Sequence, residues 1–264
     1  MMTRETDLLT LVVLLALAAA LAYNISFLHN KSIGYFSLLQ ILYLVVIPGF
    51  LFVFIFSALQ EILARPQNRE VFLSDGLLTN LTLLSVLFTY GGVAIHTVTK
   101  MLKRALVKEK QEVALAINRY FHLSFSHNLY LSGAVLMIVA LTLLELNHLP
   151  RATSAGMLAT VLKGLFLGVS FLGGLYFYTR RDDYVIYEGY TGRWADLKLV
   201  FVVAWMGGVG VIYAVRKLDP TLRQYSLLLP VLISFLLFAL LNAVLVVRRL
   251  RRGGWRVFLR RPRD

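Results

Sequence analysis

The sequence contains no cysteine. This absence excludes disulfides, thiolate metal sites, iron–sulfur clusters and cysteine nucleophiles together. Charged residues are also scarce: they make up 16% of the chain, whereas a typical soluble domain has about 25%. The chain has no G-x-x-x-x-G-K-[ST], G-x-G-x-x-G, G-x-S-x-G or H-E-x-x-H motif. No phosphate-binding loop, dinucleotide site, hydrolase nucleophile or zinc-protease helix is therefore indicated.

Hydrophobic residues dominate instead, at 58% of the 264 residues, with a mean hydropathy of +0.72. Runs of about 20 apolar residues recur along the chain, and each is long enough to cross a bilayer as a helix. Strands of a membrane barrel would show two-residue alternation over about 10 residues. The apolar runs of this chain are longer and continuous, so helices are favoured. We predict an all-α integral membrane protein with seven transmembrane helices in one domain over residues 1–247. The predicted spans are about 8–28, 35–59, 75–97, 127–146, 156–178, 197–215 and 227–247.

Two local features refine these spans. The first apolar run begins at Leu8 without a basic segment before it or a small-residue cleavage site after it, so we interpret it as a retained helix. Pro48-Gly49 falls inside the second span and predicts a kink.

Residues 100–121 contain good helix formers and no proline or glycine. The third and fourth helices are therefore expected to continue past the membrane surface as a helical hairpin.

The distribution of basic residues predicts the orientation. Most lysines and arginines flank one side of the spans: they lie at Lys31, within 100–119, within 180–198 and in the tail 248–264. The positive-inside rule places this side in the cytoplasm. We expect an outside N-terminus, a cytoplasmic C-terminus and a location in the plasma membrane. The net charge of +13 then reflects cytoplasmic loops facing anionic lipid, with no specific nucleic-acid partner.

A polar stripe follows the third predicted helix. Its members recur every three or four residues and share one face: Asp75, Thr79, Thr82, Ser85, Thr89, Gly92, His96, Lys100 and Lys103. A polar face must turn away from lipid. It fits either close packing against neighbouring helices or a substrate path, for which Asp75, Thr79, Thr82, Ser85 and Thr89 are the candidates.

Histidines gather on the predicted cytoplasmic side, with His96, His122 and His127 as the candidate cofactor ligands. Neutral imidazole ligates metals and haem. His122 and His127 are five residues apart, which places them about 140° apart on a straight α-helix, so they are not expected to share one ion. A site would need His96 from the other helix with one of the two. The alternatives are histidines at helix ends without a ligand, or a proton-relay or lipid-headgroup role.

Small residues and the basic tail suggest contacts with partners. Gly164 and Gly168 form a G-x-x-x-G motif, and glycines recur within 197–215. These two helices are expected to pack on each other or to form a homodimer. The tail interleaves arginines with aromatic residues, which suits an anionic membrane surface. The predicted lipid contacts are Arg248, Arg249, Arg251, Arg252, Trp255 and Arg256.

Three functional hypotheses follow. The first is non-catalytic binding, transport or assembly of a small or lipid-like ligand, and it is favoured because no catalytic constellation is visible. The second is a haem- or metal-binding redox protein that uses the histidines. The third is an enzyme on a lipid phosphate, with Mg²⁺ held by Asp182 and Asp183 in the cytoplasmic loop. Within the membrane, Glu145 and Lys163 are close enough in the predicted threading to form an ion pair.

Overall fold

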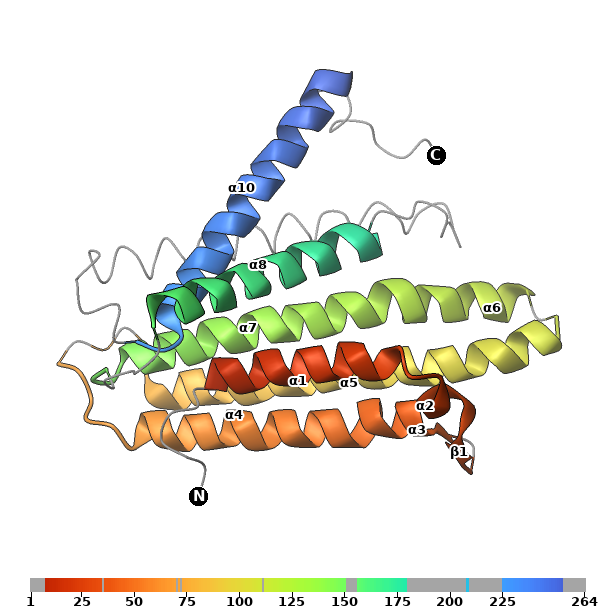
Figure 1. The fold of residues 1–264 in the computed structure, drawn as a ribbon, viewed down its shortest axis with the longest axis horizontal. Helices are drawn as coiled ribbons and strands as arrows, with labels where there is room; N and C mark the ends of the chain where they lie inside the picture. The colour runs from red at the N-terminus through yellow and green to blue at the C-terminus, as the bar shows by residue number, and fades with distance from the viewer. Residues whose placement is uncertain are drawn as a thin grey trace.

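The computed structural model describes residues 8–34, 36–69, 71, 73–110, 112–150, 156–179, 208 and 225–253, which are mostly helical (Figure 1). The elements are α1 (Leu8–Tyr23), α2 (Ser26–Asn30), β1 (Ser32–Ile33), β2 (Phe36–Ser37), α3 (Leu38–Ile41), η1 (Leu42–Val46), α4 (Ile47–Leu63), α5 (Asp75–Lys108), α6 (Glu112–Arg119), η2 (Tyr120–Phe125), α7 (Ser126–Leu146), α8 (Met157–Thr179) and α10 (Leu228–Gly253). The two short strands pair antiparallel, with Ser32 opposite Ser37.

Three continuous helical segments in the described part of the chain are long and apolar enough to cross a membrane. They are Leu38–Leu63, Asp75–Lys108 and Glu112–Leu146. Shorter apolar helices cover Leu9–Ala19, Met157–Ser170 and Leu228–Leu237. These lengths and compositions confirm that the protein is a helical membrane protein. The predicted span 197–215 lies outside the described residues except for Gly208, which is helical.

From α1 to α8 the long helices run alternately in opposite directions, and α10 starts at the same end of the bundle as α8 (Figure 1). α5 and α7 pack along each other as an antiparallel pair, α1 lies against α4, and α8 lies against α10. We call the end of the bundle that holds residues 64–69, 73–74, 147–149 and 225–227 the outer end. The opposite end, which holds β1, β2 and the turn between α5 and α6, is called the inner end.

The second span is one helical segment with a local irregularity. Ser37 begins it with a capping box, in which its side chain accepts from the Gln40 backbone and its own N–H donates to the Gln40 side chain. A π-helical turn over Leu42–Val46 then precedes Pro48 in the first turn of α4. Proline has no backbone N–H and disrupts the usual i→i−4 ladder. A kink was predicted at Pro48-Gly49; the structure places a π turn over Leu42–Val46, which ends two residues before Pro48.

The helices predicted to continue through residues 100–121 do so and form a helical hairpin. α5 has 34 residues, which span about 51 Å, whereas the hydrocarbon core is about 30 Å thick. α6, η2 and α7 continue without a break from Glu112 to Leu146. Lys110 closes the turn with a positive φ of 53°. The α5–α7 pair is therefore longer than one perpendicular crossing of a bilayer needs, and its position beyond the membrane surface stays a prediction.

The hydrophobic core lies between α5 and α7 and reaches α4 and α10. Its fully buried members include Leu78, Leu141, Leu144, Ile55 and Val231. Many large apolar side chains elsewhere on these helices are exposed, which is expected of helices that face lipid.

Candidate functional site

Three histidines from two antiparallel helical segments meet near the inner end. His96 comes from α5, His122 from η2 and His127 from the first turn of α7. The rings of His96 and His122 stack, with centroids 4.2 Å apart and planes 24° apart. The ring of His127 stands edge-on to that of His96, with centroids 4.7 Å apart. We call His96, His122 and His127 the histidine cluster.

The π turn of η2 explains why both histidines of the second helix join the cluster. On a straight α-helix, residues five apart point about 140° away from each other, and we therefore did not expect His122 and His127 to share one ion. The π turn fits an extra residue into the helix and brings both rings towards His96. His122 lies inside this turn and His127 follows it directly, and their ring centroids are 6.3 Å apart.

Hydrogen bonds fix the orientation of the His122 ring. Its Nδ1 lies 3.1 Å from the backbone carbonyl oxygen of His96 and 3.0 Å from Thr99 Oγ1. A carbonyl oxygen can only accept, so Nδ1 carries the hydrogen and donates it. Thr99 Oγ1 in turn donates to the Ile95 carbonyl at 2.6 Å. The neutral His122 ring is then left with Nε2 as its acceptor.

The Nδ1 atom of His96 is buried and has no hydrogen-bond partner among the described residues. Buried polar atoms are almost always paired with protein, water or a ligand. Asn118 closes the site from α6 by donating to the Thr99 carbonyl at 2.9 Å. The cluster thus presents a buried nitrogen that lacks a partner among the described residues, next to Thr99, Asn118 and His122 Nδ1, whose hydrogen bonds are made.

The ring arrangement bears on the predicted cofactors. Among the described residues, no group of three histidine, aspartate or glutamate side chains is positioned to hold a metal ion. Imidazole lone pairs lie in the ring plane, so the stacked rings of His96 and His122 do not aim their nitrogens at one ion. These two rings are also in face-to-face contact, which leaves no room for a haem between them. The geometry favours a ligand held by hydrogen bonds and charge.

Lysine charge surrounds the cluster. Lys100 interacts electrostatically with both His96 and His122, and Lys103 interacts with His122. Lys100 is half-buried and Lys103 is exposed. The cluster therefore lies in a positive field at the inner end.

The polar stripe of α5 is mostly covered by α7. Thr82, Ser85 and Thr89 are buried, and their hydroxyls donate to the carbonyls of Leu78, Leu81 and Ser85 four residues earlier on the same helix. A Cβ added at Gly133 would lie 2.5 Å from Thr89 Oγ1 and 2.6 Å from the Ser85 carbonyl. Thr79, the fourth predicted path residue within the helix, is half-buried. The buried part of the stripe is a helix contact.

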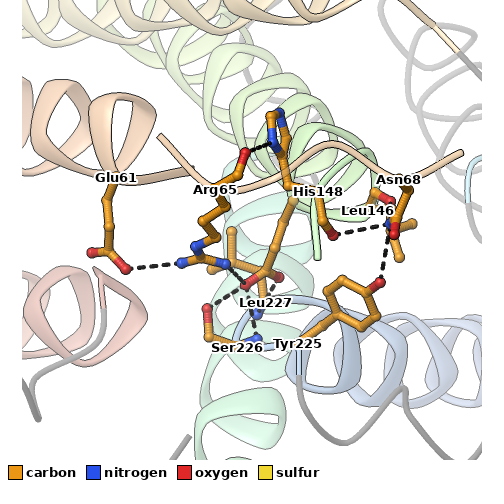
Figure 2. A network of polar contacts seen from close by, with 9 residues as sticks. Glu61, Arg65, Asn68, Leu146, His148, Tyr225, Ser226 and Leu227 are labelled. Carbon is orange, nitrogen blue, oxygen red and sulfur yellow. Dashed lines mark hydrogen bonds and ion pairs between the residues drawn. The ribbon is translucent and has the colours of Figure 1, made fainter. Parts of the chain in front are cut away.

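A second polar cluster occupies the outer end (Figure 2). The Glu145 side chain is only 1% exposed. Its Oε1 accepts from the backbone N–H and the hydroxyl of Ser226, and its Oε2 accepts from the backbone N–H of Leu227. Arg65 Nη1 lies 3.7 Å from the same carboxylate, and Arg65 Nη2 pairs with Glu61 at 2.9 Å. Glu145 thus caps the start of α10 from another helix.

Neighbouring contacts extend this outer network to α5. Asn68 Nδ2 donates to the carbonyls of Leu146 and His148, and its distance to the Tyr225 hydroxyl is 3.4 Å (Figure 2). Asn147 Nδ2 donates to Asp75 Oδ1 at 2.8 Å, and His148 Nε2 lies 3.2 Å from Asp75 Oδ2. Asp75 is therefore a network residue at the outer end. We call these contacts among residues 61–75, 145–148 and 225–227 the outer network.

Sequence reasoning missed most of the outer network. From the sequence, an ion pair between Glu145 and Lys163 was feasible, and a Glu145 side chain among the headgroups was the favoured alternative. In the structure Glu145 is buried against Arg65, Ser226 and Leu227. Ser226 is 81 residues from Glu145 in the chain, and no local pattern links them. The signal available in the sequence was Glu145 itself, a single acidic residue at the end of an apolar helix. A charge buried there needs a partner, although the sequence does not identify that partner.

The G-x-x-x-G motif of α8 contacts α10. A Cβ added at Gly164 would lie 2.7 Å from the Ile233 side chain and 2.8 Å from the Pro230 carbonyl, and one at Gly168 would lie 2.9 Å from the Ser234 carbonyl. This face of α8 is thus covered within the chain by a helix other than the one predicted. The glycines of 197–215 other than Gly208 lie outside the described residues, and homodimerisation through them stays a prediction.

Two other predicted sites lie mainly outside the described residues. Asp182 and Asp183, the candidate Mg²⁺ ligands of the loop, lie outside the described residues. Trp255 and Arg256 of the predicted lipid-contact tail also lie outside them. Arg248, Arg249, Arg251 and Arg252 continue helix α10, with Arg251 exposed. Their lipid contacts stay predictions.

Comparisons with other proteins leave the function to be argued from the structure itself. No protein-family model, no curated protein and no solved structure matches this chain.

Proposed function

We propose that the protein is a seven-span membrane protein of the plasma membrane that binds a small or lipid-like ligand without catalysing a reaction. The binding site is the histidine cluster at the inner end of the α5–α7 pair. The observation that carries the proposal is the convergence of three imidazoles from two helices around the buried, unpartnered Nδ1 of His96. A ligand that supplies the missing hydrogen bond would satisfy this atom.

The polar stripe supports holding rather than conducting a ligand. Thr82, Ser85 and Thr89 donate their hydrogens to their own helix and are covered by α7. A continuous path through this interface would require α5 and α7 to separate. The outer network ties three chain segments together at the other end. Both features favour a site that is entered at the inner end.

We expect His96→Gln to lose a ligand that the wild-type protein retains. Native mass spectrometry of protein purified in mild detergent should reveal a bound mass on the wild type, absent from His96→Gln and retained by the control His29→Gln. His29 lies in α2, outside the cluster. The thermal unfolding midpoint should confirm that both variants are folded. A wild type that carries no bound mass, or equal retention by His96→Gln, would contradict the proposal.

The proposed orientation places the outer end outside the cell and the histidine cluster in the inner leaflet. It is supported by the excess of basic residues around α5 and α6 and in the tail. Because the chain has no cysteine, single cysteines can be labelled without background.

A membrane-impermeant maleimide should label Gly156→Cys on intact cells and Lys108→Cys only after permeabilisation. Gly156 is exposed with open space at its Cβ position, and Lys108 is exposed at the hairpin end. The reverse pattern would invert the proposed orientation. Labelling of both variants from outside would show that the segment Glu112–Leu146 between the two sites does not cross the membrane.

A further inference from the structure

We propose that the ligand of the histidine cluster is a phosphate group, recognised by the cluster together with Lys100 and Lys103. This inference rests on the proposed binding function and names its ligand class. The proposal is argued from charge, from the depth of the cluster in the membrane and from the half-buried setting of its side chains.

The charge around the cluster is unbalanced. Between Asp75 and Glu145 the only acidic residues are Glu109 and Glu112, and both lie at the turn of the hairpin. The same stretch holds six basic residues, namely Lys100, Lys103, Arg104, Lys108, Lys110 and Arg119. Lys100 and Lys103 act on the ring of His122. An anion at the cluster would offset this local positive charge.

The depth of the cluster matches the level of lipid phosphates. His96 lies about 32 Å from Asp75 along α5, at about 1.5 Å per residue. This is close to the hydrocarbon thickness of about 30 Å. If Asp75 marks the outer boundary, the cluster lies where the inner headgroups begin. Basic pockets between helices at this level are a recognised way to bind anionic headgroups.

The side chains at the cluster supply both positive charge and hydrogen-bond donors. Lys100, His96 and His122 are half-buried, so they stand between the helix interior and the headgroup layer. A lysine ammonium has three donors, and an imidazole can donate from either ring nitrogen once it is protonated. The unpartnered His96 Nδ1 is one such donor position. A phosphate, with several strong acceptor oxygens, fits this set better than a neutral headgroup.

The test compares two sources of phosphate. The protein is placed in nanodiscs of phosphatidylcholine alone or with phosphatidic acid, and bound lipid is measured by native mass spectrometry. In a second arm, inorganic phosphate is titrated onto detergent-purified protein and the ¹⁵N resonances of the imidazoles are followed. Retention of phosphatidic acid without a response to inorganic phosphate would identify a lipid headgroup. Shifts with inorganic phosphate would identify a soluble ligand of the same chemistry.

The variants distinguish binding at the histidine cluster from binding to other basic residues on the surface. Lys103→Gln should weaken phosphatidic acid binding about fivefold, as expected for loss of one charge near headgroups. Lys108→Gln removes the same charge from the same helix at the hairpin end, and it should bind as the wild type does. His122→Gln should weaken binding while the protein stays folded.

The outcomes separate this inference from the function on which it rests. Equal binding by Lys103→Gln and wild type, or equal retention of phosphatidylcholine and phosphatidic acid, would overturn the phosphate assignment. A stoichiometric metal lost in His96→Gln would overturn it while keeping the cluster as a binding site. No bound mass of any kind would overturn both.

Discussion

Replacing Glu145 with alanine is expected to lower the free energy of unfolding by roughly 3–5 kcal/mol, the range for breaking a buried ion pair. The change removes the acceptor for three donors, namely the N–H and hydroxyl of Ser226 and the N–H of Leu227. It also leaves Arg65, whose side chain is only 16% exposed, with Glu61 as its remaining carboxylate. Unfolding of the purified protein in mixed micelles, followed by circular dichroism, measures the loss.

Glu61→Gln is the matched control for this experiment. Its carboxylate binds the same arginine, but its side chain is 49% exposed, and exposed ion pairs contribute about 0–1 kcal/mol. Glu145→Gln should fall between the two, because the amide retains one acceptor oxygen for the α10 backbone. A Glu145→Ala protein that unfolds like Glu61→Gln would show that the carboxylate does not hold α10.

Gly92→Ala and Gly91→Ala are expected to have opposite effects although the residues are adjacent. A Cβ at Gly92 would lie 2.5 Å from the Tyr130 backbone nitrogen and 2.7 Å from the Ser126 carbonyl. Backbone atoms cannot move away by a rotamer change as a side chain can, so α5 and α7 must separate. This separation should lower the free energy of unfolding by roughly 1–3 kcal/mol. A Cβ at Gly91 meets only Leu129 Cδ2, at 3.6 Å.

Gly91→Ala should therefore leave stability unchanged or raise it by up to about 1 kcal/mol, through the better helix propensity of alanine. The same unfolding measurement applied to both variants gives the contrast. Because Ser126 and Tyr130 flank His127, Gly92→Ala should also weaken ligand retention at the cluster. Equal stabilities for the two variants would mean that the helices are not in backbone contact at Gly92.

The helices were largely predictable because their apolar runs are long and their ends carry local signals. The third span was expected to begin at Asp75, and α5 does so, with Ser74 Oγ accepting from the Leu77 N–H. The fourth was expected to end at 146, where α7 ends. The continuation of both helices through residues 100–121 was also expected, because that stretch holds good helix formers and no proline or glycine.

The candidate site was predicted in its residues but not in its geometry. His96, His122 and His127 were chosen by residue type and side, yet their convergence depends on the π turn Tyr120–Phe125. A straight helix is the natural assumption from periodicity, and a single π turn changes every angle after it. The partner of Glu145 was likewise beyond sequence reasoning, because side-chain type does not identify which of several distant segments supplies the donors.

The separation between Glu145 and its partners also has a consequence for biogenesis. A ribosome that adds about 5–20 residues per second needs about 4–16 s to make the 81 residues from Glu145 to Ser226. Arg65 is already synthesised during that interval, but the donors at the start of α10 are not. The outer end can therefore close only when the last helix is delivered to the membrane. A chain that ends before Ser226 would keep the Glu145 carboxylate without the three donors that satisfy it in the folded protein.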